Sequence, residues 1–273
     1  MRVVVLSSSV YSETACAMVA AMADAGHVPV GALSLRTWDH RTLIRKLGQW
    51  GIANSARYVR KKLIGGNSTS AALHNPYLAQ FLANHGQPLR NLRDVAKLYR
   101  FPVATCSDQN SSPAVAQLRR WAPDVVVFAG GNILRQGVLD LPRLGVINVH
   151  LGLLPHVRGM SSPEWSLLQG VPVGITIHYM DSGIDTGRIL LCREFPDTAD
   201  CHSLEDLRNQ LIAFGVRQLT DVLSSLDRGT ISPQTQSQLD QDNQFFVIHE
   251  RLRILASERL AASCVAAIGA EVA

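Results

Sequence analysis

The sequence predicts an α/β fold built on a mostly parallel sheet. Residues 3–6 form a short, wholly apolar run, which is typical of a buried strand. Residues 14–25 follow with apolar side chains at helical spacing and end at Gly26, the kind of residue that commonly terminates a helix. A second apolar stretch at 27–33 then completes a strand–helix–strand unit. Such a unit requires two parallel strands with the helix packed on one face.

The same alternation returns after residue 100. Short apolar runs predict strands at 101–104, 124–129 and 146–149, and helical spacing predicts a helix at 113–122. Residues 174–180 and 188–195 alternate apolar and polar side chains on either side of a glycine-containing loop. We therefore expect these two segments to pair as an antiparallel hairpin beside the parallel strands.

The clearest predicted helix spans residues 203–227. Ser203 can cap its first turn, Asp206 follows three residues later, and Gly229 lies just beyond its end. After Ile231 the pattern weakens to a polar linker at 232–243 and a last helix from about His249. These boundaries predict one main domain at 1–229 and a C-terminal linker and helix at 230–273.

The α/β alternation pauses between residues 36 and 95. Within 36–62 eight Lys and Arg residues accompany one acidic residue, so this stretch is much more basic than the whole chain, whose net charge is +4. Leu43, Leu47 and Trp50 recur at helical spacing, which predicts an amphipathic basic helix, and a second helix is expected at 56–64. The basic run is expected to be a solvated helix face, or else a contact for an anionic partner such as nucleotide phosphates or tRNA.

Composition narrows the class of protein. The chain has 273 residues, of which 47% are hydrophobic and 18% charged, so disorder throughout is excluded. Its five cysteines (Cys16, Cys106, Cys192, Cys201 and Cys264) show no CxxC spacing, and its nine histidines show no HxxxH pair. We expect reduced thiols in a cytoplasmic protein, no metal site and no membrane partner. The uncharged stretch at 260–270 is too short to span a bilayer.

The most informative segment is 146–187. Asn148 and His150 lie two residues apart on a predicted strand, so their side chains share one face. They come at the carboxyl end of that strand, where open α/β sheets bind their ligands. Asp185 lies in a glycine-rich loop that the fold can bring to His150. An amide donor, an imidazole base and a carboxylate that tunes the base form a site suited to acyl transfer.

These motifs resemble those of the folate-dependent formyltransferase family. The resemblance rests on the order Asn-x-His at 148–150, Leu-Leu-Pro at 153–155, Arg-Gly at 158–159 and Asp-x-Gly-x-Asp-Thr-Gly at 181–187. It covers the N-terminal strand–helix–strand unit and about 101–229. The resemblance implies a Rossmann-like formyltransferase domain. This chain departs from the family pattern in a helical insert at 36–95, after the second strand, and in a short C-terminal extension.

The resemblance also implies which residues form the site. Asn148, His150 and Asp185 match the family's catalytic residues, and N10-formyltetrahydrofolate is the implied formyl donor. The family's folate pocket is matched by two loops, which contain Gly131, Asn132, Ile133 and Leu134 on one side and Asp181, Gly183 and Ile184 on the other. Candidate acceptor contacts are Arg158, Met160, Trp165, Arg41 and Arg45.

Several of these residues also have simpler interpretations. Asp181 is expected mainly to shape its loop, as Asp does in turns. Arg158 can order the glycine-rich loop instead of binding an anion, and Met160 and Trp165 can equally be core residues. His27 and His178 are both expected to be structural residues that form hydrogen bonds.

The expected function is transfer of a formyl group from N10-formyltetrahydrofolate to the amine of a small substrate. A nucleotide-linked amino sugar is the leading acceptor, followed by another biosynthetic amine. Three alternatives stay open: a methionyl-tRNA formyltransferase, a formyltetrahydrofolate hydrolase, and a folate- or nucleotide-binding protein without catalysis. The short stretch after Gly229 favours a small acceptor over tRNA, and its helix is a candidate contact for a homodimer.

Overall fold

The computed structural model describes residues 1–36, 74–237 and 243–271. The predicted basic helices at 43–50 and 56–64 lie outside these residues, as do Arg41 and Arg45. None of the described helices is long and apolar enough to cross a membrane.

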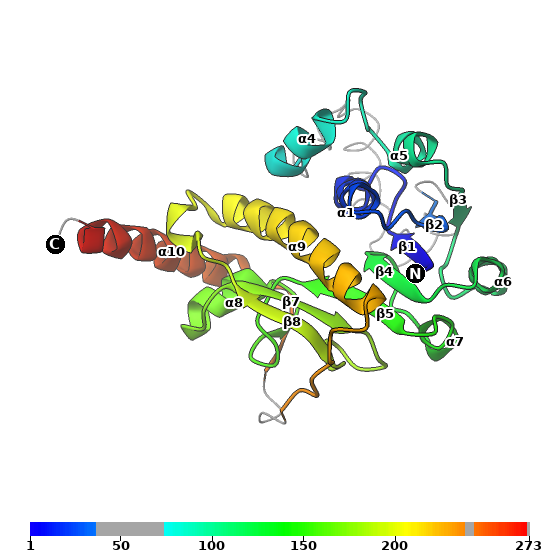
Figure 1. Cartoon of the computed structure of the whole chain (residues 1–273). Coiled ribbons are helices and arrows are strands. Elements are labelled where there is room, and N and C mark those ends of the chain that lie inside the picture. Colours follow the sequence, from blue (N-terminus) through cyan, green and yellow to red (C-terminus); the bar gives the residue numbers. More distant parts are fainter. Residues whose placement is uncertain (37–73, 238–242, 272–273) are drawn as a thin grey trace, which may run out of the picture.

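A seven-stranded sheet forms the centre of the fold, in the order β3-β2-β1-β4-β5-β7-β8 (Figure 1). The parallel strands are β1 (Val3–Ser7), β2 (Gly31–Leu35), β3 (Val103–Cys106), β4 (Val125–Ala129) and β5 (Gly145–His150). The antiparallel strands β7 (Gly174–Tyr179) and β8 (Ile189–Glu194) continue the sheet beyond β5. The prediction of a mostly parallel sheet with one antiparallel hairpin is confirmed.

Helices cover both faces of this sheet, which explains its continuous apolar runs. On β1, Val3 and Val5 face one hydrophobic cluster, while Val4 and Leu6 face the other. The first cluster lies under α1 (Glu13–Asp24), α4 (Pro76–Ala83), α5 (Leu92–Tyr99) and α9 (Leu204–Asp227). The second lies under α6 (Ser112–Trp121) and the short α7 (Gln136–Leu139).

The remaining elements gather near the end of the sheet formed by β7 and β8. They are β6 (Arg158–Gly159), α8 (Ser162–Gln169), η1 (Thr198–Asp200), β9 (Gln244–Phe245) and α10 (Glu250–Glu271). β6 and β9 pair in parallel as a separate two-stranded sheet. The helix α10 contacts α8 and η1 and projects from the body of the molecule, with Ala256 and Leu260 buried (Figure 1).

Two predicted strands begin too early in the sequence, and proline explains both shifts. β2 starts at Gly31 instead of residue 27, because Pro29 has no N–H to add to the ladder. β3 starts at Val103 instead of residue 101, because Pro102 has the same defect and Phe101 donates its N–H to Ala96 at the end of α5. The sheet register is set after each proline.

Residues 151–163 are rich in glycine and proline, and they contain structure that the sequence patterns did not predict. β6 lies within this segment, and α8 begins at Ser162 with Pro163 in its first turn, where the missing N–H of proline costs nothing. α7 was also missed. In contrast, the predicted cap of α9 is confirmed, since Ser203 Oγ accepts a hydrogen bond of 3.0 Å from the Asp206 N–H.

Candidate active site

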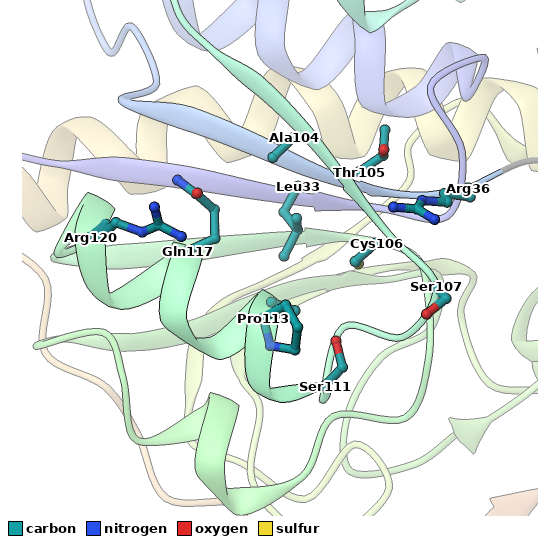
Figure 2. A pocket seen from close by; sticks show the side chains of 11 residues that line it. Leu33, Arg36, Ala104, Thr105, Cys106, Ser107, Ser111, Pro113, Gln117 and Arg120 are labelled. Carbon is teal, nitrogen blue, oxygen red and sulfur yellow. The ribbon is translucent and has the colours of Figure 1, made fainter.

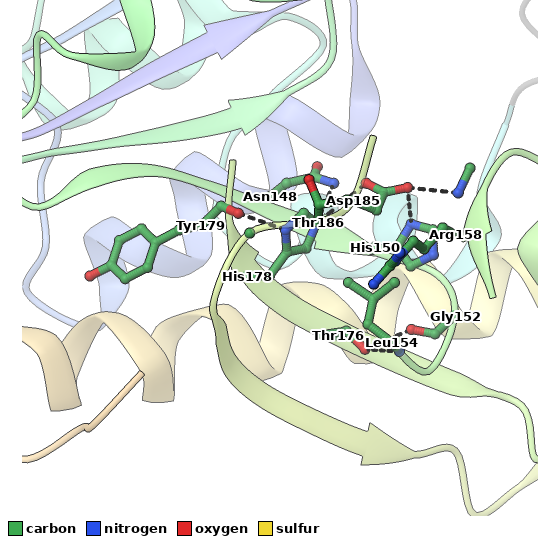
Figure 3. A network of polar contacts seen from close by, with 12 residues as sticks. Asn148, His150, Gly152, Leu154, Arg158, Thr176, His178, Tyr179, Asp185 and Thr186 are labelled. Atoms are coloured by element: carbon green, nitrogen blue, oxygen red, sulfur yellow. Dashed lines mark hydrogen bonds and ion pairs between the residues drawn. The ribbon is translucent and has the colours of Figure 1, made fainter. Parts of the chain in front are cut away.

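The carboxyl end of β5 carries the two polar side chains that the sequence singled out. Asn148 is half-buried and His150 is 6% exposed. β7 pairs with β5 so that His178 lies directly opposite Asn148, and Thr176 opposite His150. Three of these four side chains, Asn148, His150 and His178, take part in one network of polar contacts with Asp185 (Figure 3).

Asp185 reaches this network from the loop between β7 and β8. Its Oδ2 lies 3.3 Å from Nδ1 of His150, and its Oδ1 lies 3.4 Å from Nε2 of His178. The N–H of Gly159 donates to Oδ2 at 2.8 Å. The structure therefore brings together Asn148, His150 and Asp185, as the sequence predicts, and sets the carboxylate between two imidazoles.

The backbone of Asp185 is unusual, since its φ is 54°. A non-glycine residue in this left-handed region needs support from its surroundings. Gly187, two residues later, passes so close to β7 that an added Cβ would lie 1.8 Å from the Tyr179 carbonyl oxygen. The loop is thus held tightly against β7 at the point where it presents the carboxylate.

For both Asp185 and His150, burial and the neighbouring groups shift the pKa in opposite directions. Burial raises the pKa of Asp185, but the contacts with His178 and His150 and the hydrogen bond from the Gly159 N–H together hold that pKa below its ordinary value. Burial lowers the pKa of His150 below its ordinary value, although Asp185 and the Val157 carbonyl pull it upward. A carboxylate beside a largely neutral imidazole is therefore the resting state at neutral pH.

The hydrogen bonds of His150 define where its proton lies. Nε2 must donate to the Val157 carbonyl, 2.7 Å away, because a carbonyl can only accept. Ser162 Oγ lies 3.3 Å from the same nitrogen. In the neutral ring Nδ1 then carries the lone pair and faces Asp185. Nδ1 is therefore the atom that can take up a proton, and the carboxylate stabilises the cation that results.

Sequence patterns did not separate His178 from His27, but the structure does. His27 forms a hydrogen bond with Ser224 Oγ at 2.9 Å, far from the site, as expected of a structural histidine. His178 is 1% exposed; its Nδ1 donates to the Tyr179 carbonyl, so Nε2 can accept from Asn148 Nδ2 at 3.3 Å. The alternation at 174–180 indicates the face on which His178 lies, but the sequence predicted pairing only with 188–195, so it did not place His178 opposite Asn148.

The loop after β4 contains the four residues predicted to hold the pterin, and the side chain of Gln109 holds this loop in place. Gln109, which is fully buried, accepts from the Asn132 N–H at 3.0 Å and donates to the carbonyls of Ser7 and Gly130. Its own N–H donates to Asn132 Oδ1 at 3.1 Å. Sequence reasoning missed Gln109, because a lone polar residue in a loop shows no pattern.

The loop itself offers a ligand both apolar surface and backbone groups. Ile133 is 87% exposed, whereas Leu134 is buried at 5% and anchors the loop in the core. Asn110 holds the same loop through the Ile133 carbonyl and the Arg135 N–H. Within the described residues, the Ile133 and Leu134 N–H groups and the Asn132 carbonyl form no hydrogen bond in the protein. That Gly131 and its neighbours bind folate remains a prediction.

Replacing Gln109 by Leu is expected to weaken binding of the folate donor about tenfold, because the loop would lose its fixed position. The change also leaves buried backbone groups without partners, which costs about 1–3 kcal/mol of stability. Calorimetric titration with tetrahydrofolate measures the first effect, and thermal melting measures the second. Gln117→Leu on α6 is the matched control, and an unchanged dissociation constant in Gln109→Leu would contradict the support role.

The second predicted folate loop shows what Asp181 does. Its Oδ1 accepts hydrogen bonds from the Gly183 N–H at 3.0 Å and from Thr186 Oγ1, so it shapes the loop as expected. Ile184 is 47% exposed on the same loop. Contact between this loop and folate remains a prediction.

The predicted acceptor contacts Arg158, Met160 and Trp165 differ in their exposure and in their hydrogen-bond partners. Arg158 donates to Gln236 Oε1 through Nε and Nη2, so its guanidinium orders a neighbouring segment. Met160 is 59% exposed and is therefore not a core residue. Trp165 stacks on Phe245 with ring centroids 4.8 Å apart and donates to the Phe246 carbonyl. No acceptor role for these three residues is tested by the structure.

A cavity of about 290 Å³ lies elsewhere, between β3 and α6 (Figure 2). Leu33, Ala104 and Cys106 form part of its wall, and Arg36 and Arg120 lie at opposite ends. None of the predicted site residues that the structure describes lines it, so this cavity and the Asn148–His150–Asp185 cluster are separate places. In the part of the chain that the structure describes, no three His, Cys, Asp or Glu residues are grouped as metal ligands would be.

Comparison with known proteins gives both a family and a fold. A family model described as formyl transferase matches residues 75–223. The methionyl-tRNA formyltransferase of Pelobacter propionicus is 36% identical over 150 residues, which are 54% of this chain and 46% of that protein. The enzyme of the same name from Bordetella pertussis is 41% identical over 128 residues, or 46% of this chain and 41% of that protein. The match thus spans less than half the length of these curated relatives.

Among solved structures, an N-formyltransferase from Helicobacter canadensis is similar with a TM-score of 0.55 and 13% identity. The likeness covers 96% of this chain and 80% of that one, and at this identity it concerns the fold alone. That structure is described as a complex with folinic acid and dTDP-3-aminofucose.

Proposed function

We propose, from the premise that this chain belongs to the formyl transferase family, that it transfers a formyl group from N10-formyltetrahydrofolate to the amine of a small acceptor. The observation that carries the proposal is the cluster of Asn148, His150 and Asp185 at the carboxyl end of β5. The family match at 75–223 includes all three residues.

The loop at 131–134 fits a folate donor. A pterin ring needs hydrogen-bond donors and acceptors along its edge and apolar surface against its face. The Asn132 carbonyl and the Ile133 N–H, which have no hydrogen-bond partner among the described residues, and the exposed Ile133 side chain supply both kinds of contact. The complex with folinic acid in the similar Helicobacter canadensis structure supports a donor of this class. When bound, the donor supplies an already activated formyl carbon.

Asn148 is suited to stabilise negative charge on the formyl oxygen. One Nδ2 hydrogen points to His178 Nε2, and among the described residues the other has no partner. Such a donor, held in place before reaction, contributes roughly 3 kcal/mol to transition-state stabilisation in comparable sites. His178 positions the amide, because it accepts the first hydrogen.

His150 accepts the proton that the attacking amine loses, and Asp185 assists it. Nδ1 of His150 takes up a proton, and the Asp185 carboxylate 3.3 Å away stabilises the cation that forms. The buried position of His150 keeps its imidazole neutral, and therefore basic, before the reaction. The same proton can then pass to the leaving nitrogen.

A nucleotide-linked amino sugar is the leading acceptor, and another biosynthetic amine is next. The support is the likeness to the Helicobacter canadensis fold, which extends over 96% of this chain and was described with dTDP-3-aminofucose. Met160 and Phe246 are exposed and directly follow the paired residues Gly159 and Phe245, so they offer apolar surface for a planar base.

Methionyl-tRNA formylation is the second candidate. The relatives of that name are 36% and 41% identical to this chain over the matched residues. These relatives match about half of this chain, so the likeness does not extend to acceptor contacts in the other half.

The purified protein is expected to release tetrahydrofolate from N10-formyltetrahydrofolate only when a suitable amine is present. The panel comprises nucleotide-linked amino sugars and charged methionyl-tRNA, and absorbance follows the release. Release with one amine class names the acceptor. Release without any amine indicates a hydrolase. In the control variant His150→Ala, folate should still bind while transfer is lost; full activity in that variant would overturn the mechanism, and folate binding without turnover in the wild type would indicate a binding protein.

A further inference from the structure

Two stretches after α9 lie against the loops that form the candidate active site. They are residues 234–236 and 243–248, and both lie beyond the family match, which ends at residue 223. Gln234 forms an antiparallel bridge with Ile189 through two backbone hydrogen bonds of 2.8 Å. This bridge anchors the first stretch at the start of β8, four residues from Asp185.

Gln236 then holds the Asp185 loop directly. Its Nε2 donates to the carbonyl of Asp185 at 2.8 Å and to the carbonyl of Gly187 at 2.7 Å. Its Oε1 accepts from Arg158 Nη2 at 2.9 Å. One amide therefore joins the backbone of Asp185, whose φ is 54°, to the β6 strand.

The second stretch orients the other support of Asp185. The N–H groups of Arg158 and Met160 donate to the carbonyls of Asn243 and Phe245. Neighbouring N–H groups on a strand point in opposite directions, so the N–H of Gly159, between them, points away from β9 and donates to Asp185 Oδ2. An added Cβ on Gly159 would lie 2.1 Å from the Phe245 carbonyl oxygen, so this close pairing requires glycine.

Aromatic packing fixes the second stretch to α8. Trp165 stacks on Phe245, and its Nε1 donates to the Phe246 carbonyl at 2.9 Å. The N–H of Ile248 donates to Ser161 Oγ, at the start of the same helix. Ser162, the next residue, contacts His150. The stretch is therefore held to the same small region that contains the proposed proton acceptor.

We propose that the two stretches 234–236 and 243–248, through Gln236 and β9, position the Asp185 carboxylate against His150, and that Gln236 is a positioning residue for the reaction. This inference rests on the proposed function only for the role of Asp185 in catalysis. The geometric part, that Gln236 sets the distance between carboxylate and imidazole, stands independently. It assigns a role in the site to a part of the chain that the family match does not include.

Gln236→Met tests the proposal in the full chain, because it removes both hydrogen-bonding ends without changing charge or length. Gln234→Met is the matched control, since the exposed Gln234 acts through its backbone. The first readout is the NMR titration of the His150 imidazole, whose neighbours that titrate are Asp185 and His178. The second is kcat and KM for formyl transfer.

In Gln236→Met the titration midpoint of His150 is expected to fall by about 0.5 pH unit or more, because Asp185 raises it in the native geometry. We expect kcat to fall about tenfold to a hundredfold while KM for the donor stays within about threefold. Gln236→Asn keeps the amide but withdraws it by one methylene, so it should shift both quantities in the same direction by less. Gln234→Met should match the wild type.

The proposal is overturned if Gln236→Met titrates and turns over like Gln234→Met. It is also overturned if activity falls only as far as the melting temperature does, with the His150 titration unchanged, since that pattern indicates general stabilisation. If the wild type transfers no formyl group to any acceptor but the His150 titration still shifts in Gln236→Met, the proposed function fails and the positioning role holds.

Discussion

An Asp185→Asn variant is expected to lose about a thousandfold in kcat, within the range that general acid–base groups contribute. The side chain keeps its size, so the loop can keep its shape. The lost element is the negative charge 3.3 Å from His150 Nδ1, which stabilises the imidazolium formed when the ring accepts a proton. The same carboxylate lies 3.4 Å from His178 Nε2, so both imidazoles lose a negatively charged neighbour.

The pH dependence of this variant has a definite sign. Activity requires neutral His150, so the rate rises as pH increases through the pKa of His150. Burial lowers that pKa and Asp185 partly restores it, so removing the carboxylate lowers it further. The acid limb of the kcat/KM profile should therefore move to lower pH in Asp185→Asn, while the plateau falls.

Asp181→Asn is the matched control for this experiment. It makes the same chemical change on the same loop, but Asp181 bonds only Gly183 and Thr186 among the described residues and is exposed. We expect its kcat to stay within about threefold of the wild type. Equal losses in the two variants would mean that the loop, and not the Asp185 charge, is what the reaction needs.

An Arg208→Ala variant is expected to lose about 3 kcal/mol of folding free energy, because it leaves a buried carboxylate without its partner. Glu164, on α8, is 1% exposed, and Arg208, on α9, donates to it through Nε and Nη2 at distances of 2.5–3.1 Å. Arg208 is itself about one-third exposed, so water can replace part of the loss. The melting midpoint should fall by about 6–12 °C.

Two controls separate this effect from the loss of any ion pair. Arg143→Ala breaks the exposed pair with Asp124, in which the Arg143 side chain is 69% exposed, and should cost less than about 1 kcal/mol. The double variant Glu164→Gln with Arg208→Ala removes the buried charge and should recover part of the stability. A single Arg208→Ala variant as stable as the wild type would show that Glu164 finds another partner or solvent.

The parts of the fold that could be predicted are those whose signal is local. β1 and β4 are almost wholly apolar and β5 is apolar except for Asn148 and His150, because helices cover both faces of the sheet, and each strand was found within about one residue. The cap at Ser203 and the alternation of β7 and β8 are equally local. α8 was missed, because a loop rich in glycine and proline masks the start of a helix.

In the candidate site, too, the residues with a local sequence signal could be predicted and the others could not. Asn148 and His150 could be paired from their spacing on one strand, and the resemblance to a known family pointed to Asp185. His178, Gln109 and Gln236 were not found, since each contributes through a hydrogen bond to a residue more than twenty positions away. The alternation of β7 in the sequence indicates which residues share a face with His178. His178 is placed at the site only by the pairing of β7 with β5.

By itself, the sequence determined the alternation of strands and helices, the antiparallel hairpin and the residue types of the candidate site. The tertiary structure alone decided which groups surround the Asp185 carboxylate. His150, Gly159, His178 and Gln236 come from different segments and meet there through loop packing. Periodicity reports which face of an element is buried, whereas hydrogen bonds between distant segments depend on how the finished elements pack. The geometry that tunes His150 is therefore a property of the folded chain.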